Sequence, residues 1–133
     1  MSPYDVVRPA LFALPAETAH GVGTSVLNVA QGTLVERLAR DRLRVDDPRL
    51  ATTAFGQSFP NPVGVAAGFD KNAELPGMLA ALGFGHVEVG GVTAERQPGN
   101  PKPRMFRLRA DRAIINRMGF NNHGADDIGD RLA

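Results

Sequence analysis

The segment Val63–Gly91 constrains the fold of this sequence more than any other. Residues 63–67 form a short apolar run typical of a strand, residues 73–82 carry apolar side chains at helical spacing, and residues 86–91 again have a strand pattern. A strand, a helix and a second strand in close succession predict a βαβ unit, whose strands pair in parallel and whose crossover is right-handed. The segment therefore indicates an α/β fold.

A single βαβ unit is not a complete fold of this kind. A parallel sheet needs cover on both faces, and two parallel strands cannot close a barrel. A barrel of eight β/α units takes about 250 residues, whereas this chain has 133. We therefore expect the chain to be the front portion of a larger protein.

The residues before this unit have a different pattern. Residues 1–40 predict two short helices with apolar faces, separated by a break at Leu14–Pro15. A charged linker follows at 40–49, so we place a boundary between a helical segment, 1–40, and the main fold, 41–133. Further strands are predicted at 51–55, 57–59, 105–108 and 113–115, and a final helix is predicted from Asn122 or His123 through Leu132.

Composition argues against several classes of protein. The formal net charge of +1 gives no support for nucleic-acid binding, and the absence of cysteine excludes disulfides and thiolate metal sites. The three histidines lack the spacing of metal ligands, so no metal is expected. No apolar run approaches the roughly 18 residues of a membrane span. Pro9 and Pro15 interrupt the continuous apolar core that a signal peptide would need.

Small residues mark the exit of the first strand of the βαβ unit. Ala66, Ala67 and Gly68 would let a planar or phosphorylated ligand lie against the backbone, and Gly68 also permits a positive φ. Lys71 then stands at the carboxyl end of a strand, where α/β folds bind ligands. The alternative is an ordinary strand-to-helix turn with a solvated lysine.

A second candidate segment is Ile115–Asn122. The side-chain amides of Asn116 and Asn121 both donate and accept hydrogen bonds, which suits a planar heterocycle with carbonyl and N–H edges. Residues 118–120 would add apolar contact and close approach of the backbone. The alternative for Asn121–Asn122 is a turn followed by a helix N-cap.

Four segments, in this order, resemble the quinone-dependent (class 2) dihydroorotate dehydrogenases. They are Asn-Pro-Val-Gly-Val-Ala-Ala-Gly-Phe-Asp-Lys at 61–71, residues 78–90, Pro-Gly-Asn-Pro-Lys-Pro-Arg-Met-Phe-Arg-Leu at 98–108, and Ile-Asn-Arg-Met-Gly-Phe-Asn at 115–121. The resemblance runs from about Tyr4 to the end of the chain and covers roughly the first third of a family member. It implies a TIM-type barrel that binds FMN, of which residues 41–133 would be the first part.

The resemblance implies oxidation of (S)-dihydroorotate to orotate in de novo pyrimidine biosynthesis, with a membrane quinone as acceptor. By position, FMN would contact Ala67, Gly68, Phe69, Asp70, Lys71 and Gly91. The substrate would contact Lys71, Asn116, Arg117, Met118, Gly119 and Phe120. The family usually has Thr or Ser in place of Gly91, and the missing hydroxyl costs roughly 0.5–1.5 kcal/mol. The general-base serine is expected beyond residue 133, so we expect no catalytic residue in this chain and no turnover by it alone.

In class 2 enzymes a pair of N-terminal helices forms the tunnel through which quinone reaches the flavin. His20 and Arg107 resemble the histidine and arginine of that site, although the residues alone would suit a helix surface and a strand edge. The amphipathic pair also fits shallow docking at a membrane surface. The resemblance thus implies a peripheral protein at the cytoplasmic side of the cell membrane.

Two other functions remain open. One is another FMN barrel, such as a dihydrouridine synthase, although the segment 116–121 and the helical segment argue against it. The other is a non-catalytic chain that only docks on membranes or partners through its N-terminal helices. Flavin content separates this last function from the two enzymes.

Overall fold

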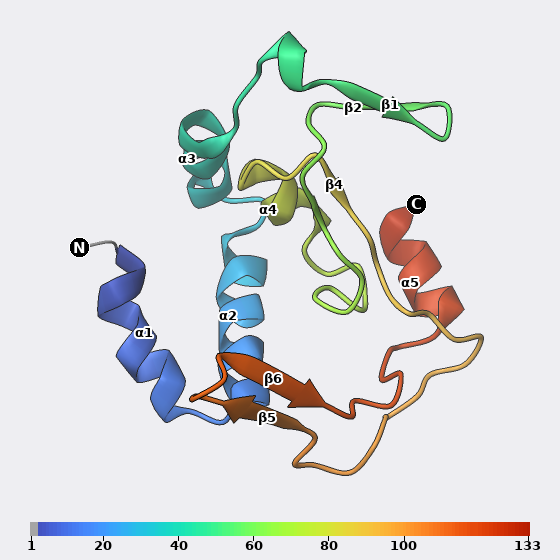
Figure 1. The fold of residues 1–133 in the computed structure, drawn as a ribbon. Helices are drawn as coiled ribbons and strands as arrows, with labels where there is room; N and C mark the ends of the chain where they lie inside the picture. Colours follow the sequence, from blue (N-terminus) through green and yellow to red (C-terminus); the bar gives the residue numbers. More distant parts are fainter. Residues whose placement is uncertain (1–2) are drawn as a thin grey trace.

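A computed structural model describes residues 3–133 and contains both helices and strands (Figure 1). Their order is α1 (Pro3–Ala13), α2 (Ala16–Ala30), α3 (Leu34–Leu43), β1 (Thr52–Ala54), β2 (Gln57–Phe59), β3 (Gly64–Val65), α4 (Pro76–Ala81), β4 (His86–Val87), β5 (Met105–Leu108), β6 (Ala113–Asn116) and α5 (Ala125–Leu132). A short 3-10 helix, Pro48–Leu50, precedes β1. The mixture of helices and strands agrees with the predicted α/β fold.

The N-terminal region forms three helices rather than the predicted two. The break at Leu14–Pro15 is confirmed, but α3 occupies part of the predicted linker. Two neighbouring residues cause the extra break. Gly32 takes a positive φ of 75°, and the Thr33 hydroxyl accepts a hydrogen bond from the N–H of Val35 at 3.2 Å, which caps α3. The boundary at residue 40 lies within α3 and stays a prediction.

Apolar side chains of α4 and of the turn before it form most of the core. The buried hydrophobic residues there are Ala73, Leu75, Met78, Leu79 and Ala81. β3 and β4 flank α4 in the sequence and pair in parallel, as predicted. α4 is shorter than the predicted 73–82, because Ala73 adopts a positive φ of 55° and Pro76 opens the first turn. Full burial of a side chain such as Leu79 stabilises the fold by about 1.5–3 kcal/mol.

Two antiparallel pairs of strands accompany this unit, and both occur where strands were predicted. β1 and β2 pair around a turn at Phe55–Gly56, and β5 pairs with β6. The last helix, α5, begins at Ala125, later than predicted. The reason is that the Asn122 side chain braces the preceding loop. Its Oδ1 accepts from the N–H of Gly124 at 2.9 Å, and its Nδ2 donates to the Phe120 carbonyl at 2.7 Å.

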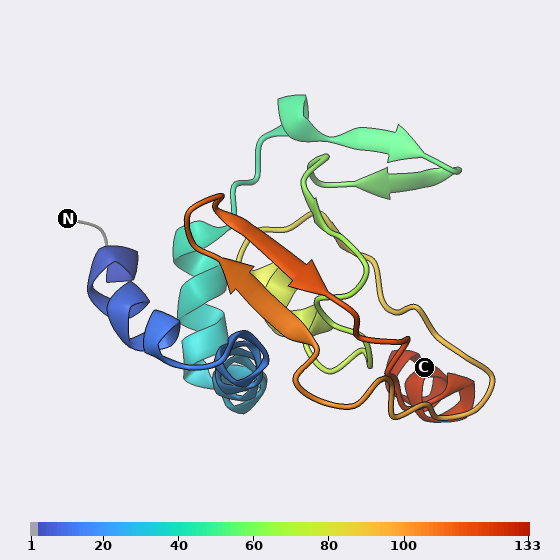
Figure 2. The same ribbon diagram turned by 60° about the horizontal axis from the view of Figure 1, so that its bottom comes forward.

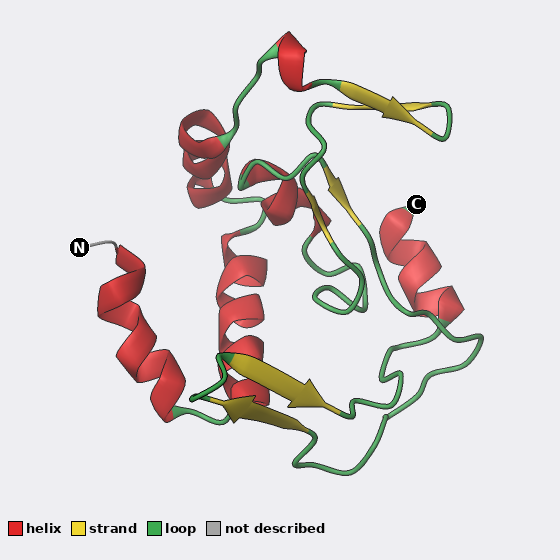
Figure 3. Cartoon of the chain, in the orientation of Figure 1, coloured by secondary structure: helices red, strands yellow, loops and turns green. Residues whose placement is uncertain are grey.

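The arrangement of these elements leaves the sheets separate. α1 and α5 lie on opposite sides of the molecule in both ribbon views (Figures 1 and 2). Long loops connect β4 to β5 and β6 to α5 (Figure 3). The strands of residues 3–133 form three two-stranded sheets, so these residues contain no closed barrel. None of the helices in this part of the chain combines the length and the apolar character that crossing a membrane requires.

Candidate functional site

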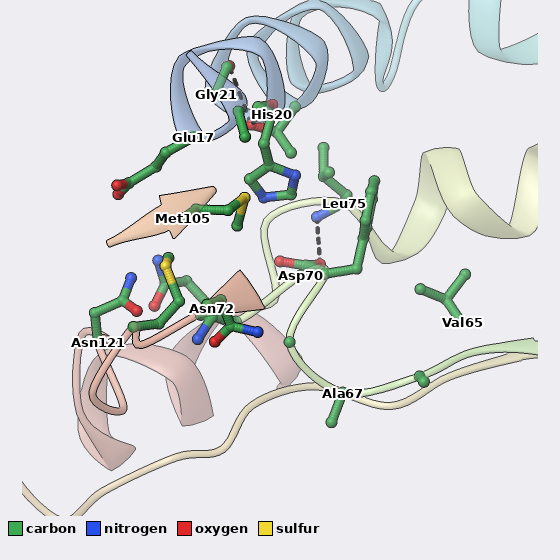
Figure 4. A pocket seen from close by; sticks show the side chains of 18 of the residues that line it. Glu17, His20, Gly21, Val65, Ala67, Asp70, Asn72, Leu75, Met105 and Asn121 are labelled. Carbon is green, nitrogen blue, oxygen red and sulfur yellow. Dashed lines mark hydrogen bonds between the residues drawn. The ribbon is translucent and has the colours of Figure 1, made fainter. Parts of the chain in front are cut away.

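A cavity of about 870 Å³ lies between α2, the loop after β3, the β5–β6 hairpin and the segment that follows it (Figure 4). Most of the site residues expected from the sequence meet here. They are His20, Ala67, Gly68, Phe69, Asp70, Lys71, Arg107, Asn116, Met118 and Asn121. The cavity therefore joins the strand exit, the asparagine segment and the helical region in one place.

The loop after β3 offers an open stretch of backbone to the cavity. Ala66, Ala67 and Gly68 are exposed, and Gly68 has a φ of 99°. An added Cβ at Gly68 would meet no atom within 4 Å, so free space lies directly beside the backbone. A glycine has no side chain of its own, so a planar group can approach the backbone closely at Gly68.

Asp70 is buried, with 3% of its surface exposed, and its carboxylate faces the beginning of α4. Its two oxygens accept hydrogen bonds from the backbone N–H groups of Glu74 and Leu75, both at 2.8 Å, and Figure 4 shows the second of these. N–H groups at the beginning of a helix lack partners within the helix, and a carboxylate satisfies them well. Asp70 therefore fixes the loop to α4 and holds the adjacent Lys71 at the cavity.

Lys71 is partly buried, and burial lowers the pKa of its ammonium group below the ordinary value of 10.5. The positive charge of Arg104 lowers this pKa further, while the negative charge of Glu17 raises it. Burial has the largest effect because removing an ammonium group from water disfavours its charged form. Glu17 belongs to α2 and lines the same cavity. Charged groups from distant parts of the chain thus influence the protonation of Lys71.

The helical region reaches the cavity through His20 on α2, and Figure 4 shows its imidazole pointing toward the loop after β3. The ring meets that of Phe69 edge-to-face, with 5.2 Å between the centroids. Arg107, on β5, donates hydrogen bonds to the carbonyls of Leu14 at 2.6 Å and Leu11 at 3.3 Å. Carbonyls at the end of a helix lack partners within it, so Arg107 ties the hairpin to the corner between α1 and α2.

The asparagine segment enters the cavity only in part. Asn116, Met118 and Asn121 line it. The buried Oδ1 of Asn121 has no hydrogen-bond partner among residues 3–133. Buried polar atoms are nearly always paired in folded proteins, by protein, water or another bound group. This oxygen is therefore an exception among the buried polar atoms of the described residues.

Four of the predicted contact residues do not line the cavity: Gly91, Arg117, Gly119 and Phe120. The side chain of Phe120 is 70% exposed. An added Cβ at Gly119 would come within 2.8 Å of Asn100, so this glycine permits close packing of two loops. Arg117 donates to the carbonyl of Pro103 at 3.2 Å. Their proposed contacts with flavin or substrate stay predictions.

Arg104 is a buried residue whose role the sequence did not indicate. It is 7% exposed and pairs with Glu17, 87 positions earlier in the chain, at 2.8 Å. A partner so distant in sequence produces no periodic or local pattern. The one local signal is a charged residue between a proline-rich loop and an apolar strand.

Comparison with known proteins gives matches along the whole chain. The family model described as dihydroorotate dehydrogenase matches residues 49–133. A dihydroorotate dehydrogenase (quinone) of Natronomonas pharaonis is 69% identical over 133 residues, which cover 100% of this chain and 38% of that protein. A protein of the same name from Mycobacterium tuberculosis is 53% identical over 131 residues, which cover 98% of this chain and 37% of that protein.

Solved structures agree with these matches. The DHODH of Eimeria tenella in complex with ferulenol has a TM-score of 0.63 and 52% identity, over 74% of this chain and 28% of that chain. The ligand-free form has a TM-score of 0.64 and 48% identity, over 81% of this chain and 30% of that chain. The chain spans 38% of the length of the Natronomonas relative, which agrees with the expectation that it corresponds to about a third of a family member.

Proposed function

This chain belongs to the dihydroorotate dehydrogenase family, and we propose that it supplies one side of the active site of a quinone-dependent member. The proposed reaction is oxidation of (S)-dihydroorotate to orotate in de novo pyrimidine biosynthesis, with FMN as cofactor and a membrane quinone as electron acceptor. Residues 41–133 would form the first part of a (β/α)8 barrel. The names of the relatives at 69% and 53% identity, which both specify quinone, favour this class.

The observation that carries this proposal is the meeting of three sequence segments in one cavity. The loop after β3 contributes Ala67–Lys71, the asparagine segment contributes Asn116 and Met118, and α2 contributes His20. A flavin has to stand beside both its substrate and its acceptor, because electrons pass to it from the one and from it to the other. A single cavity with all three sets of residues meets that requirement.

The geometry of the strand exit supports the proposal that FMN binds there. Apart from its two chain neighbours, no residue would come within 4 Å of a Cβ added at Gly68, and the residues of this loop are exposed. Asn121 lines the same cavity, and a side-chain amide can both donate and accept hydrogen bonds. Ala67, Gly68, Phe69, Asp70 and Lys71 are the residues proposed to hold the cofactor, with Gly91 as a weaker contact. When bound, FMN supplies the hydride-accepting chemistry.

Lys71 is proposed to act through its charge. Its position beside the cavity allows the ammonium group to stabilise negative charge that develops nearby during hydride transfer. The hydrogen bonds of Asp70 to α4 hold the loop in advance, so the charge does not have to be moved into place. The amide of Asn116 is proposed to bind the carbonyl and N–H edges of orotate. Arg117, Met118, Gly119 and Phe120 complete the proposed substrate segment.

The quinone side of the proposed site is formed by His20 and Arg107. His20 stacks edge-to-face on Phe69, one of the proposed flavin contacts, so an acceptor beside α2 would be close to the flavin. Apolar side chains on the outside of the helices, including Val7, Val22 and Val26, are exposed. We propose that they dock shallowly on the cytoplasmic surface of the cell membrane.

Flavin binding tests the proposal directly. FMN is titrated into the purified chain, and quenching of its fluorescence reports binding. Lys71→Met is expected to weaken binding about tenfold, because it removes a charged contact of about 1.5 kcal/mol. Arg42→Met is the matched control, since it removes the same charge from an exposed position on α3. A folded chain that binds vesicles but no FMN would contradict the proposal and favour a docking role.

A further inference from the structure

We propose that Arg104 is a positioning residue for the substrate segment, residues 116–120, and that Glu17 holds Arg104 in place from α2. The inference rests on the proposed function, because it concerns the same site. Arg104 does not line the cavity, so it acts through the backbone that it fixes. Its effect would be to set where Asn116 and Met118 stand relative to a bound ligand.

The guanidinium of Arg104 joins three separate groups. Nε and Nη2 donate to the Glu17 carboxylate at 3.1 and 2.8 Å. Nη1 donates to the carbonyl of Pro98 at 2.8 Å and to that of Asn100 at 3.0 Å. Only the planar fork of an arginine reaches all of these acceptors at once, since a lysine has a single nitrogen. Because the side chain of Arg104 is buried, a lost bond leaves one of its N–H groups unpaired in a medium of low polarity.

The loop held by Arg104 is bonded in turn to the substrate segment. The N–H of Asn100 donates to the Met118 carbonyl at 2.9 Å, and its Nδ2 donates to the Arg117 carbonyl at 2.7 Å. The N–H of Arg117 donates to the backbone carbonyl of Arg104 itself at 2.8 Å. Successive backbone groups of the segment therefore take their positions from this loop. Because Gly119 has no side chain, the backbone around it can lie close to the loop at Asn100.

Glu17 anchors this arrangement in the helical region. It lies one turn before His20 on α2, so both side chains leave the same face of the helix, and both line the cavity. Lys102 makes a second, more exposed contact with the Glu17 carboxylate at 3.4 Å. The proposed substrate side and the proposed quinone side of the site are therefore joined by one partly buried ion pair, Glu17–Arg104.

Amide hydrogen exchange, measured residue by residue by NMR on the whole chain, tests this inference without relying on activity. In Arg104→Lys, exchange at the N–H groups of Asn100 and Arg117 is expected to become about tenfold faster, as one lost hydrogen bond implies. Exchange at Leu79 and Leu82, in and after α4, is expected to change less than about twofold, because these bonds belong to a different unit.

Two further variants keep the test decisive. Glu17→Gln retains Arg104 and is expected to accelerate amide exchange at Asn100 and Arg117 by a smaller factor. This variant replaces Arg104→Lys in the test if Arg104→Lys does not fold. Arg49→Lys makes the same replacement in the exposed ion pair with Asp47 and is expected to leave them unchanged. Uniform acceleration at every amide, or no acceleration at Asn100 and Arg117, would overturn the positioning role.

Ligand titration supplies a second readout. Arg104→Lys is expected to weaken orotate binding about tenfold while leaving FMN binding within about twofold, because the loop contacts the substrate segment and not the strand exit. Equal weakening of both ligands would overturn the inference. A wild-type chain that binds neither ligand would contradict the proposed function, whereas the exchange rates would still decide the role of Arg104.

Discussion

The two walls of the cavity are held together by different forces. In the βαβ unit, residues 63–88, apolar side chains such as Leu75 and Leu79 are buried around α4. The next region, residues 93–124, consists of loops and the β5–β6 hairpin. None of the hydrophobic side chains of these described residues is buried, whereas the polar side chains of Arg104 and Asn122 are. One wall is therefore stabilised mainly by removal of apolar surface from water, and the other by buried hydrogen bonds.

This difference bears on what each wall can do. Hydrophobic packing has little directional preference, so the loop after β3 also depends on the two hydrogen bonds of Asp70 to fix its position. Hydrogen bonds depend on angle as well as distance, so they fix the directions in which a segment's polar groups point. The proposed substrate segment, 116–120, would need such directions, and the bonds of Arg104 and Asn100 supply them.

The largest expected effect is a loss of stability in the βαβ unit, the cavity wall with the buried apolar side chains. Leu79→Ala removes a buried side chain and leaves a cavity beside α4, so the free energy of unfolding is expected to fall by about 3 kcal/mol. Urea denaturation followed by circular dichroism measures it. Leu38→Ala, at an exposed leucine of α3, is the control and should cost much less. Equal costs at the two positions would show that α4 does not form the core.

The next effect tests the polar wall. Asn122→Ala leaves the N–H groups of Thr93 and Gly124 without their acceptor, and we expect a loss of about 2 kcal/mol in the free energy of unfolding. The exposed Asn28 makes one bond, to the carbonyl of Glu74, so Asn28→Ala serves as control. If Asn122→Ala cost no more than this control, buried hydrogen bonds would not be what stabilises the loop region.

A smaller effect is expected on how stability depends on pH in the acid range. Hydrogen bonds from Arg104 hold the pKa of Glu17 below its ordinary value of 4.5, although burial opposes this shift. Because the folded pKa is the lower one, the stabilisation is fully present above pH 4.5 and is lost as the pH falls through the folded value. The stability difference between wild type and Glu17→Gln is therefore expected to shrink in acid.

The control for this pH dependence is Asp47→Asn. The pKa of Asp47 is also lowered, by hydrogen bonds from Arg49, but that pair is exposed. Its contribution is expected to disappear at high salt, whereas that of Glu17 should persist, because screening acts mainly on exposed charges. Urea titrations at several pH values and two salt concentrations measure both. A difference for Glu17→Gln that stays constant with pH would contradict the linkage.

The smallest expected effect is on the pKa of Lys71, which responds to charges from other parts of the chain. Glu17 raises the pKa of Lys71 and Arg104 lowers it, so the two variants are expected to act in opposite directions. Glu17→Gln should lower the pKa of Lys71 further, and Arg104→Met should raise it. Titration of the Lys71 side chain by NMR measures both shifts. Absence of a shift in both variants would mean that burial alone controls the pKa of this lysine.

Several features of the fold and the site followed from local patterns in the sequence. Pro15 separates the first two helices, and segments on either side of turn-forming residues predicted the strand pairs. The small residues before Lys71 and the amides of Asn116 and Asn121 pointed to residues that do line one cavity. The helix break and the strand pairs are confirmed, because they depend on residues only a few positions apart.

Tertiary structure alone decided the rest. Asp70 turns its carboxylate to α4, Phe120 stays largely exposed, and Arg104 finds Glu17 across the molecule. Each of these outcomes depends on which groups the folded chain brings within hydrogen-bond distance. Patterns of apolar and polar residues along the sequence specify where elements begin and end, but a buried charge is satisfied only by partners that folding delivers.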